Sequence, residues 1–150
     1  MENCGRDGVF HIDGTYKIIK NRFPLLVFGI TDLRRTFHPI VFNITSHETE
    51  SDFIYFYKNI IKLWKEINID FYPEYIMQDA CDASLNAARL CFKNSTVLMC
   101  YFHVMQNIKK HQNLISSDLY DDLLVDLRNI HYLRNENEYN GFIINFDKKI

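Results

Sequence analysis

The sequence lacks the features that direct a chain into or across a membrane. Its first residues, Met1–Cys4, are polar and have no apolar core of the kind a secretory signal peptide needs. No apolar run approaches the roughly 18 residues that span a bilayer. The four cysteines are widely spaced and form no tight disulfide framework, so reduced thiols are expected. We therefore expect a protein of the nucleus or cytoplasm that is not secreted and has no membrane partner.

An excess of charge of one sign is also missing. The formal net charge of −2 at pH 7 provides no electrostatic footprint for nucleic acid, so any such affinity must come from local patches, metal ions or a further domain. There is no internal repeat or low-complexity segment. A hydrophobic fraction of 47% and an aromatic fraction of 15% exclude a disordered chain. At 150 residues, the chain is long enough for a domain with a real core.

A glycine-rich phosphate loop is absent after the first predicted strand, which argues against a nucleotide-binding α/β fold. The stretch Val9–Thr15 instead runs from apolar residues into an aspartate, Asp13, followed at once by Gly14. Burying a carboxylate costs roughly several kcal/mol unless it is paired, hydrogen-bonded or bound to a metal. Asp13 is therefore either a turn residue, since Asp-Gly is a common turn pair, or a functional group on a rigid strand.

Hydrophobic periodicity predicts five strands that alternate with helices in the second half of the chain. The strands are expected over residues 9–13, 23–31, 36–45, 73–79 and 96–102. Helices are expected over residues 46–67, with Ser46 or Thr49 as the N-cap, and then over 83–90 and 103–110. The pattern beyond residue 112 is purely helical. The first three strands have short connections and should form an antiparallel meander.

The resulting order, β-β-β-α-β-α-β-α, is that of a ribonuclease-H-like α/β fold with a mixed five-stranded sheet and, here, a helical C-terminal extension. In such a sheet the first and fourth strands are neighbours, and both end here on an acid, Asp13 and Asp79. Two adjacent carboxylates repel each other unless a divalent cation lies between them, which predicts Mg²⁺ or Mn²⁺. The alternative for Asp79 is the N-cap of the next helix.

Three motifs resemble the catalytic domain of Mutator-like element (MULE) transposases. Asp13–Lys17 is similar to the first-acid motif, Ile76–Ala83 to the second-acid segment, and Cys100–Ile108 to the Cys-x-x-His segment with its helix. The resemblance implies DNA transposition at an Asp-Asp-Glu site with two divalent metals, in which Asp13 and Asp79 are catalytic metal ligands. It implies transposon-end DNA as the partner and leaves open a homo-oligomer of the full-length protein. We expect a core over residues 1–112 and the start of an insertion domain over 113–150.

The chain also departs from this family's pattern. Cys81 stands where the family often has an acid, and Glu136 and Glu138 lie in a stretch that resembles the insertion rather than the final catalytic helix. We therefore expect a truncated fragment with little or no strand transfer by itself. The alternative is a catalytically inactive, domesticated remnant that serves as a DNA- or protein-binding module. The proofreading-exonuclease branch is disfavoured because Thr15 replaces the glutamate of its Asp-x-Glu motif.

Two histidine-containing patterns have both a functional and a structural interpretation. Cys100 and His103 could hold zinc together with His111 or His131, or could simply pack at a helix start. His11 lies two residues before Asp13, hence on the same face of the strand, and is more often a structural histidine than a catalytic base.

Charged residues elsewhere are interpreted mainly as structural. Glu48 and Glu50 open the first long helix, where ribonuclease H carries an acid, but we expect them to act as favourable first-turn charges. The pairs 34–35 and 109–110, both dibasic, could contact a phosphate backbone and are otherwise solvated surface.

Overall fold

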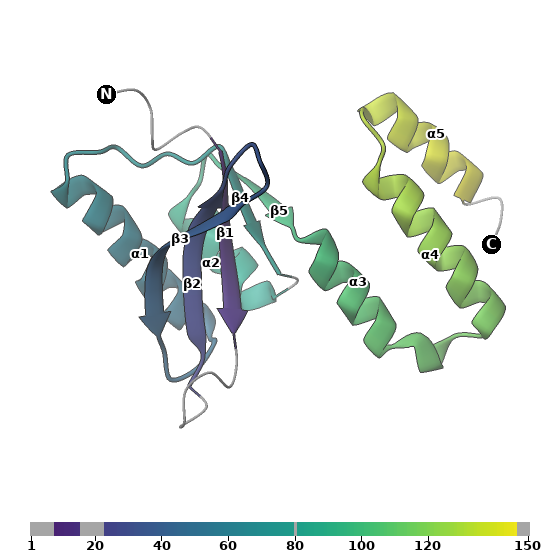
Figure 1. Ribbon diagram of the computed structural model, residues 1–150, viewed down its shortest axis with the longest axis horizontal. Helices are drawn as coiled ribbons and strands as arrows, with labels where there is room; N and C mark the ends of the chain where they lie inside the picture. Colours follow the sequence, from purple (N-terminus) through teal and green to yellow (C-terminus); the bar gives the residue numbers. More distant parts are fainter. Residues whose placement is uncertain (1–7, 16–22, 80, 147–150) are drawn as a thin grey trace. The chain divides into compact units, whose positions relative to one another are not determined.

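The computed structural model describes residues 8–15, 23–79 and 81–146 (Figure 1). The strands are β1 (Val9–Thr15), β2 (Leu25–Thr31), β3 (Phe37–Ile44), β4 (Tyr75–Gln78) and β5 (Thr96–Met99). The helices are α1 (Glu50–Glu66), α2 (Asp82–Cys91), α3 (Tyr101–Lys110), a 3₁₀ turn η1 (Gln112–Leu114), α4 (Ser117–His131) and α5 (Glu136–Phe146). Within the described residues, no helix is both long and apolar enough to span a membrane.

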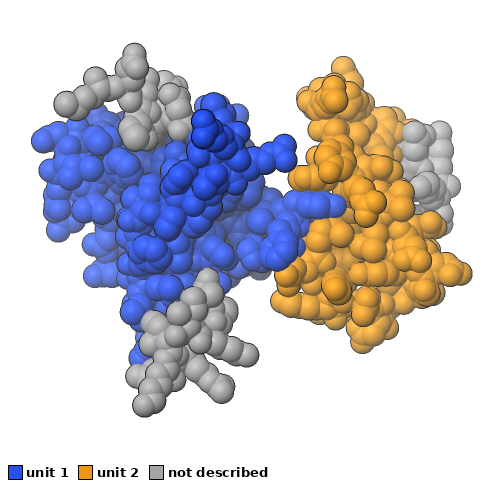
Figure 2. All heavy atoms as spheres, in the orientation of Figure 1, with its two compact units in different colours: residues 1–104 blue, residues 105–150 orange. Residues whose placement is uncertain are grey.

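The chain divides into two compact units, residues 1–104 and residues 105–150, which Figure 2 colours separately. The first unit holds all five strands with α1 and α2, and the second holds η1, α4 and α5. The division falls inside α3, after Val104, whereas we predicted a domain boundary at residue 112. That domain boundary stays a prediction.

The five strands form one mixed sheet in the order β3-β2-β1-β4-β5. β1 pairs antiparallel with β2 and parallel with β4, while β2 pairs antiparallel with β3 and β4 parallel with β5. The expected α/β class and mixed five-stranded sheet are confirmed, and the architecture is compatible with a ribonuclease-H-like fold. Because β1 and β4 are parallel neighbours, their C-terminal ends point toward the same edge of the sheet.

One face of the sheet is buried under α1 and α2 (Figure 1). Side chains alternate along a strand, so Phe10 and Ile12 of β1 enter this core while His11 and Asp13 face the other way. The residues that α1 and α2 contribute to the core are Phe53, Phe56, Tyr57, Ile60, Trp64, Ala87 and Ala88. The small side chains of α2 allow the two helices to pack closely. Between them the hydroxyl of Tyr57 lies 3.1 Å from that of Ser84, so both buried hydroxyls are satisfied.

Helix α1 begins with a capping box at Thr49, which decides between the two N-caps considered above. The Thr49 hydroxyl accepts a hydrogen bond from the backbone N–H of Asp52, and the Asp52 carboxylate accepts one from the backbone N–H of Thr49 at 3.0 Å. Ser46 is therefore not the cap. Because the helix starts after Thr49, Glu48 lies outside it, in the segment that connects β3 to α1.

The last two strands are shorter than the sequence predicts. β4 ends at Gln78 rather than Asp79, and β5 ends at Met99, so that Tyr101 and Phe102 belong to α3 and not to a strand. The Cys100 N–H still donates to Gln78 at 2.7 Å, but the Cys100 carbonyl already accepts from Val104 at 3.1 Å. The helix therefore starts immediately where the ladder stops. Aromatic residues are favourable in strands, and this preference is overridden here.

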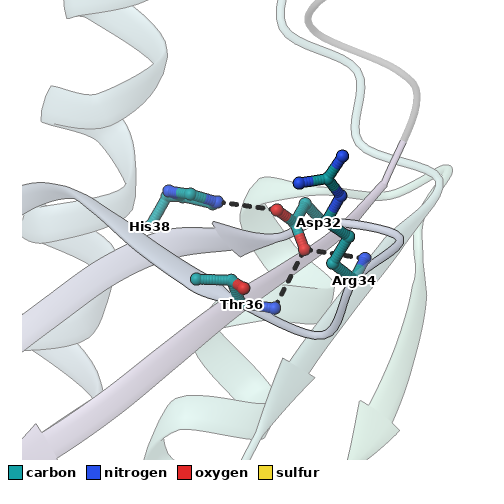
Figure 3. A network of polar contacts seen from close by, with 4 residues as sticks. All are labelled: Asp32, Arg34, Thr36 and His38. Atoms are coloured by element: carbon teal, nitrogen blue, oxygen red, sulfur yellow. Dashed lines mark hydrogen bonds and ion pairs between the residues drawn. The ribbon is translucent and has the colours of Figure 1, made fainter.

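The turn between β2 and β3 is organised by a single carboxylate, that of Asp32 (Figure 3). One oxygen accepts hydrogen bonds of 2.9 Å from the backbone N–H groups of Arg34 and Thr36, and the other lies 2.9 Å from His38 Nε2. The contact with His38, followed by the bond from Thr36, lowers the pKa of Asp32. Arg35 adopts a left-handed conformation with φ of 64°, as a tight turn requires. This network fixes where β3 begins.

β3 is the outer strand of the sheet and contains an irregularity. Val41 pairs with Phe28, whereas the next residue of β2, Gly29, pairs with Pro39, so Ile40 is an extra residue in the ladder. A side chain on Gly29 would overlap the ring of Phe37, which lies over this position. Gly29 therefore allows an aromatic ring to cover the backbone of the sheet on the face opposite α1.

We predict that replacing Thr49 with alanine lowers the free energy of unfolding by about 1 kcal/mol, the usual cost of losing an N-cap side chain. Urea denaturation measures the change. Ser51→Ala, an exposed substitution in the same helical turn, is the matched control and should stay within about 0.5 kcal/mol of the parent. Equal effects of the two substitutions would show that the capping box does not stabilise α1.

Candidate active site

Asp13 lies within β1 and not in a turn. The strand continues through Thr15, and Asp13 pairs with Val27 of β2, so the Asp-Gly turn considered from the sequence is wrong. On its other side β1 pairs with β4 only as far as His11, opposite Met77. Asp13 is thus anchored by one neighbouring strand and sits just past the end of the ladder with the other. Its carboxylate, 51% exposed, is open to a ligand.

Asp79 directly follows β4 at the same edge of the sheet. The parallel pairing of β1 with β4 ends at His11 and Met77, and Asp13 and Asp79 each follow two residues later in their chains. The N-cap of α2 is Cys81, whose side chain makes no capping hydrogen bond, so the interpretation of Asp79 as a helix cap is wrong. Asp13 is therefore not a turn residue, and Asp79 is not the N-cap of α2.

Glu48 is a third acid at this edge. Burial raises the pKa of Glu48, and the carboxylates of Asp79 and Asp13, in that order, raise it further. The side chain lies against Gly14, where an added Cβ would overlap Glu48 Oε1. Gly14 thus leaves the space that allows a glutamate from the loop before α1 to approach β1.

The prediction that Glu48 and Glu50 both act as first-turn charges of α1 is wrong for Glu48. Only Glu50 lies in the first turn of α1, while Glu48 precedes the N-cap and faces the two aspartates. The one signal that could have separated them is the Thr49 capping box, with an acid three residues after the threonine. A helix predicted to begin after Thr49 leaves Glu48 outside the first turn, where it has no favourable interaction with the helix dipole.

The three carboxylates have the donor chemistry that a hard divalent cation requires. Mg²⁺ and Mn²⁺ prefer carboxylate oxygens, and the mutual repulsion at Glu48 is what a cation would relieve. Among the residues that the structure describes, however, no three His, Cys, Asp or Glu side chains converge closely enough to hold a metal ion. The residue types fit a divalent metal, and side-chain rearrangement would be needed to coordinate it.

His103 extends the acid edge from the other side. It lies in the first turn of α3, and its Nε2 atom is 3.8 Å from Asp13 Oδ1, an ion-pair distance when the imidazole is protonated. The zinc site suggested for Cys100 and His103 stays a prediction. Its further ligands, His111 or His131, belong to the second unit. Within the first unit, His103 is oriented toward a carboxylate.

A cavity of about 310 Å³ opens beside Asp13 on the sheet face opposite α1 and α2. His11, Phe37, Phe102 and His103 are among the residues that line it. Burial lowers the pKa of His11, and the nearby Asp13 opposes this shift only in part. The pattern of the sequence placed His11 correctly on the face of Asp13 but gave no sign of the cavity.

Of the two dibasic pairs, only Arg34–Arg35 belongs to the first unit, and it lies away from the acids. Arg34 and Arg35 lie in the turn after Thr31, which pairs with Val9 at the opposite end of β1 from Asp13. Lys109 and Lys110 end α3 in the second unit. Glu138, in that same unit, accepts a hydrogen bond of 2.9 Å from the backbone N–H of Arg134 at the start of α5.

We predict that Gly14→Ala moves the Glu48 carboxylate away from β1, because the added methyl would overlap Glu48 Oε1. The end of a glutamate side chain is flexible, so stability should change by less than about 1 kcal/mol. The pKa of Glu48 should fall toward its ordinary value, as followed by carboxyl NMR titration. Gly141→Ala, which meets no atom within 4 Å, is the control. An unchanged pKa in Gly14→Ala would contradict the packing of Glu48 on Gly14.

Comparison with known proteins assigns the chain to a family. The family model of the MULE transposase domain matches residues 9–107, more than half of the chain, from the start of β1 into α3. A comparison with curated proteins gives no match. The matched region includes both aspartates, Glu48 and His103. On this match, the chain belongs to the MULE transposase domain family.

Proposed function

We propose that this protein is the catalytic core of a DDE-type transposase, which acts on phosphodiester bonds of DNA with two divalent metal ions. The observation that supports the proposal is that Asp13 and Asp79 each follow the last paired residues of β1 and β4, at one edge of the sheet, within a MULE transposase domain. In this proposal both aspartates are catalytic metal ligands, and Glu48 provides a third carboxylate from the loop before α1.

In this proposal the residues at the edge of the sheet have different roles. Asp13 is held by its pairing with β2, so its carboxylate is presented on a rigid strand. Glu48 and Asp79 belong to segments outside the strands and can adjust around bound ions. Two bound divalent ions would activate the attacking oxygen and stabilise the leaving oxygen of the phosphodiester. His103 contacts Asp13 and helps to orient the carboxylate that faces the substrate.

DNA is the partner that this chemistry requires, and transposon ends are the natural substrate of the family. The acidic edge repels a phosphate backbone when no metal is bound. With a net charge of −2, the chain has little general attraction for DNA, so we propose that bound cations provide the local attraction. Binding of DNA should therefore depend on divalent ions.

A second function is a non-catalytic remnant that binds DNA or a protein partner through the retained fold. The observation that favours it is the lack, among the described residues, of three ligating side chains that already converge on one point. The two functions differ in one property that can be measured directly, the binding of a divalent ion at Asp13 and Asp79.

We predict that the parent chain binds Mn²⁺ in a calorimetric titration and that the double variant Asp13→Asn, Asp79→Asn loses at least about tenfold in affinity. Removal of like charges should also raise the stability of the metal-free protein by about 0.2–1 kcal/mol, measured by urea denaturation. Asp70→Asn, an exposed aspartate outside the edge, is the control for both measurements. Metal binding that survives the double substitution would support the non-catalytic remnant.

We also predict slow, Mn²⁺-dependent nicking of DNA by the purified 150-residue chain, without strand transfer. Asp13→Asn should reduce the rate about a hundredfold or more, because a ligand that acts in the transition state is lost. Glu48→Gln should also reduce it if Glu48 is the third ligand, while Glu50→Gln, in the first turn of α1, should not. Nicking that is equally fast in Asp13→Asn would exclude this site as its source.

A further inference from the structure

The cavity beside Asp13 has two aromatic walls that the proposed metal chemistry does not use. Phe37 forms one wall, where its ring lies over Gly29 and meets the His11 ring edge to face, with centroids 5.9 Å apart. Phe102 lies on the side of α3 and meets the His103 ring at 5.5 Å, also edge to face. Phe37 is 41% exposed and Phe102 is 61% exposed, and both line the cavity.

The position of Phe37 is set by the turn that precedes it. Asp32 bonds the backbone N–H of Thr36 at 2.9 Å, directly before Phe37, and contacts His38, directly after it. Figure 3 shows the side chains of Asp32 and His38 directed toward each other across the turn. An exposed ring held in this way loses little further freedom when a ligand packs against it, which favours binding.

The cavity wall also contains unused hydrogen-bonding groups. His11 Nε2 and His103 Nδ1 are both buried and have no hydrogen-bond partner. Leaving such groups unpaired is unfavourable, and a ligand with a polar edge could pair with them after small ring rotations. A purely apolar ligand would leave both nitrogen atoms unpaired.

The cavity therefore requires a flat ligand with an aromatic face and a polar edge, next to a group that binds at Asp13. Its volume of about 310 Å³ is at the lower end for small-molecule sites, and it suits a single ring system rather than a peptide segment. It extends along β1 from Asp13 to Thr31, which pairs with Val9. Four residues of strand span roughly 13 Å.

We propose that this cavity receives an unpaired nucleobase of the DNA, the base of the nucleotide whose phosphate would be held beside Asp13 by the divalent ions. Phe37 and Phe102 pack against the base, and the imidazoles of His11 and His103 contact its polar edge. Aromatic side chains bind bases of any sequence in this way, because every base has a π-face. The base must leave its duplex partner to enter, so the cavity selects unpaired or extruded nucleotides. The proposal rests on the proposed function, which places the phosphate at Asp13.

The test compares two phosphates that differ only in the base. The 150-residue chain is titrated in Mg²⁺ with thymidine 5′-monophosphate and with 2-deoxyribose 5-phosphate, and affinities are measured by calorimetry. Thymidine monophosphate should bind about tenfold more tightly, the usual contribution of one base packed on an aromatic ring. Phe37→Ala and Phe102→Ala should each remove most of this difference and leave the affinity for deoxyribose phosphate unchanged.

Phe42→Ala is the matched control. Phe42 lies on β3 like Phe37, is 61% exposed like Phe102, and does not line this cavity. Its substitution should change neither affinity. Circular dichroism verifies folding, and if Phe37→Ala does not fold, Phe102→Ala decides the matter because its ring is more exposed.

The outcomes separate the cavity from the proposed function. If both phosphates bind equally in Mg²⁺, or if Phe102→Ala leaves the preference for the base intact, the nucleobase site is wrong while the metal site stands. If neither phosphate binds and Mg²⁺ itself does not bind, the proposed function fails and the nucleobase site fails with it.

Discussion

The parallel pairing of β1 with β4 is the constraint on which the rest of the site depends. It brings together two strands that are separated by more than half of the first unit and ends them at a common edge. Asp13 lies on β1, Asp79 directly follows β4, and Glu48 brings a third carboxylate, so like charges are held near each other against their repulsion. The core under Phe10 and Ile12 must provide the free energy that keeps this arrangement folded.

The parts of the site that lie on strands could be predicted from the sequence. Strand periodicity and the order of elements were enough to predict that β1, which carries Asp13, pairs with β4, which Asp79 follows, because adjacency in a sheet follows from topology. The same alternation put His11 on the face of Asp13. These inferences needed only a period of two residues and an order of elements, and both can be read without three-dimensional coordinates.

The parts of the site that come from loops and helix starts were not predicted. Glu48 approaches β1 because the chain turns into α1 one residue later and because Gly14 has no side chain there. His103 faces Asp13 because α3 starts immediately after Cys100, where strand propensity had suggested that β5 continues. The wall formed by Phe37 depends on Gly29, because a side chain at Gly29 would overlap the Phe37 ring. Phe37 and Gly29 lie on different strands, and the sequence pattern does not show this contact. Each of these contacts depends on local backbone geometry, such as a turn into a helix, that the hydrophobic pattern does not show.

The irregular pairing of β3 has a consequence for how this protein behaves at high concentration. An outer strand with free backbone groups invites the addition of a strand from another molecule, and here that strand also exposes apolar side chains such as Phe42 and Ile44. Pro39 and the extra residue Ile40 interrupt the regular ladder in the middle of this strand. The defect in pairing therefore works against edge-to-edge aggregation, and it lets an apolar strand remain at the margin of the sheet.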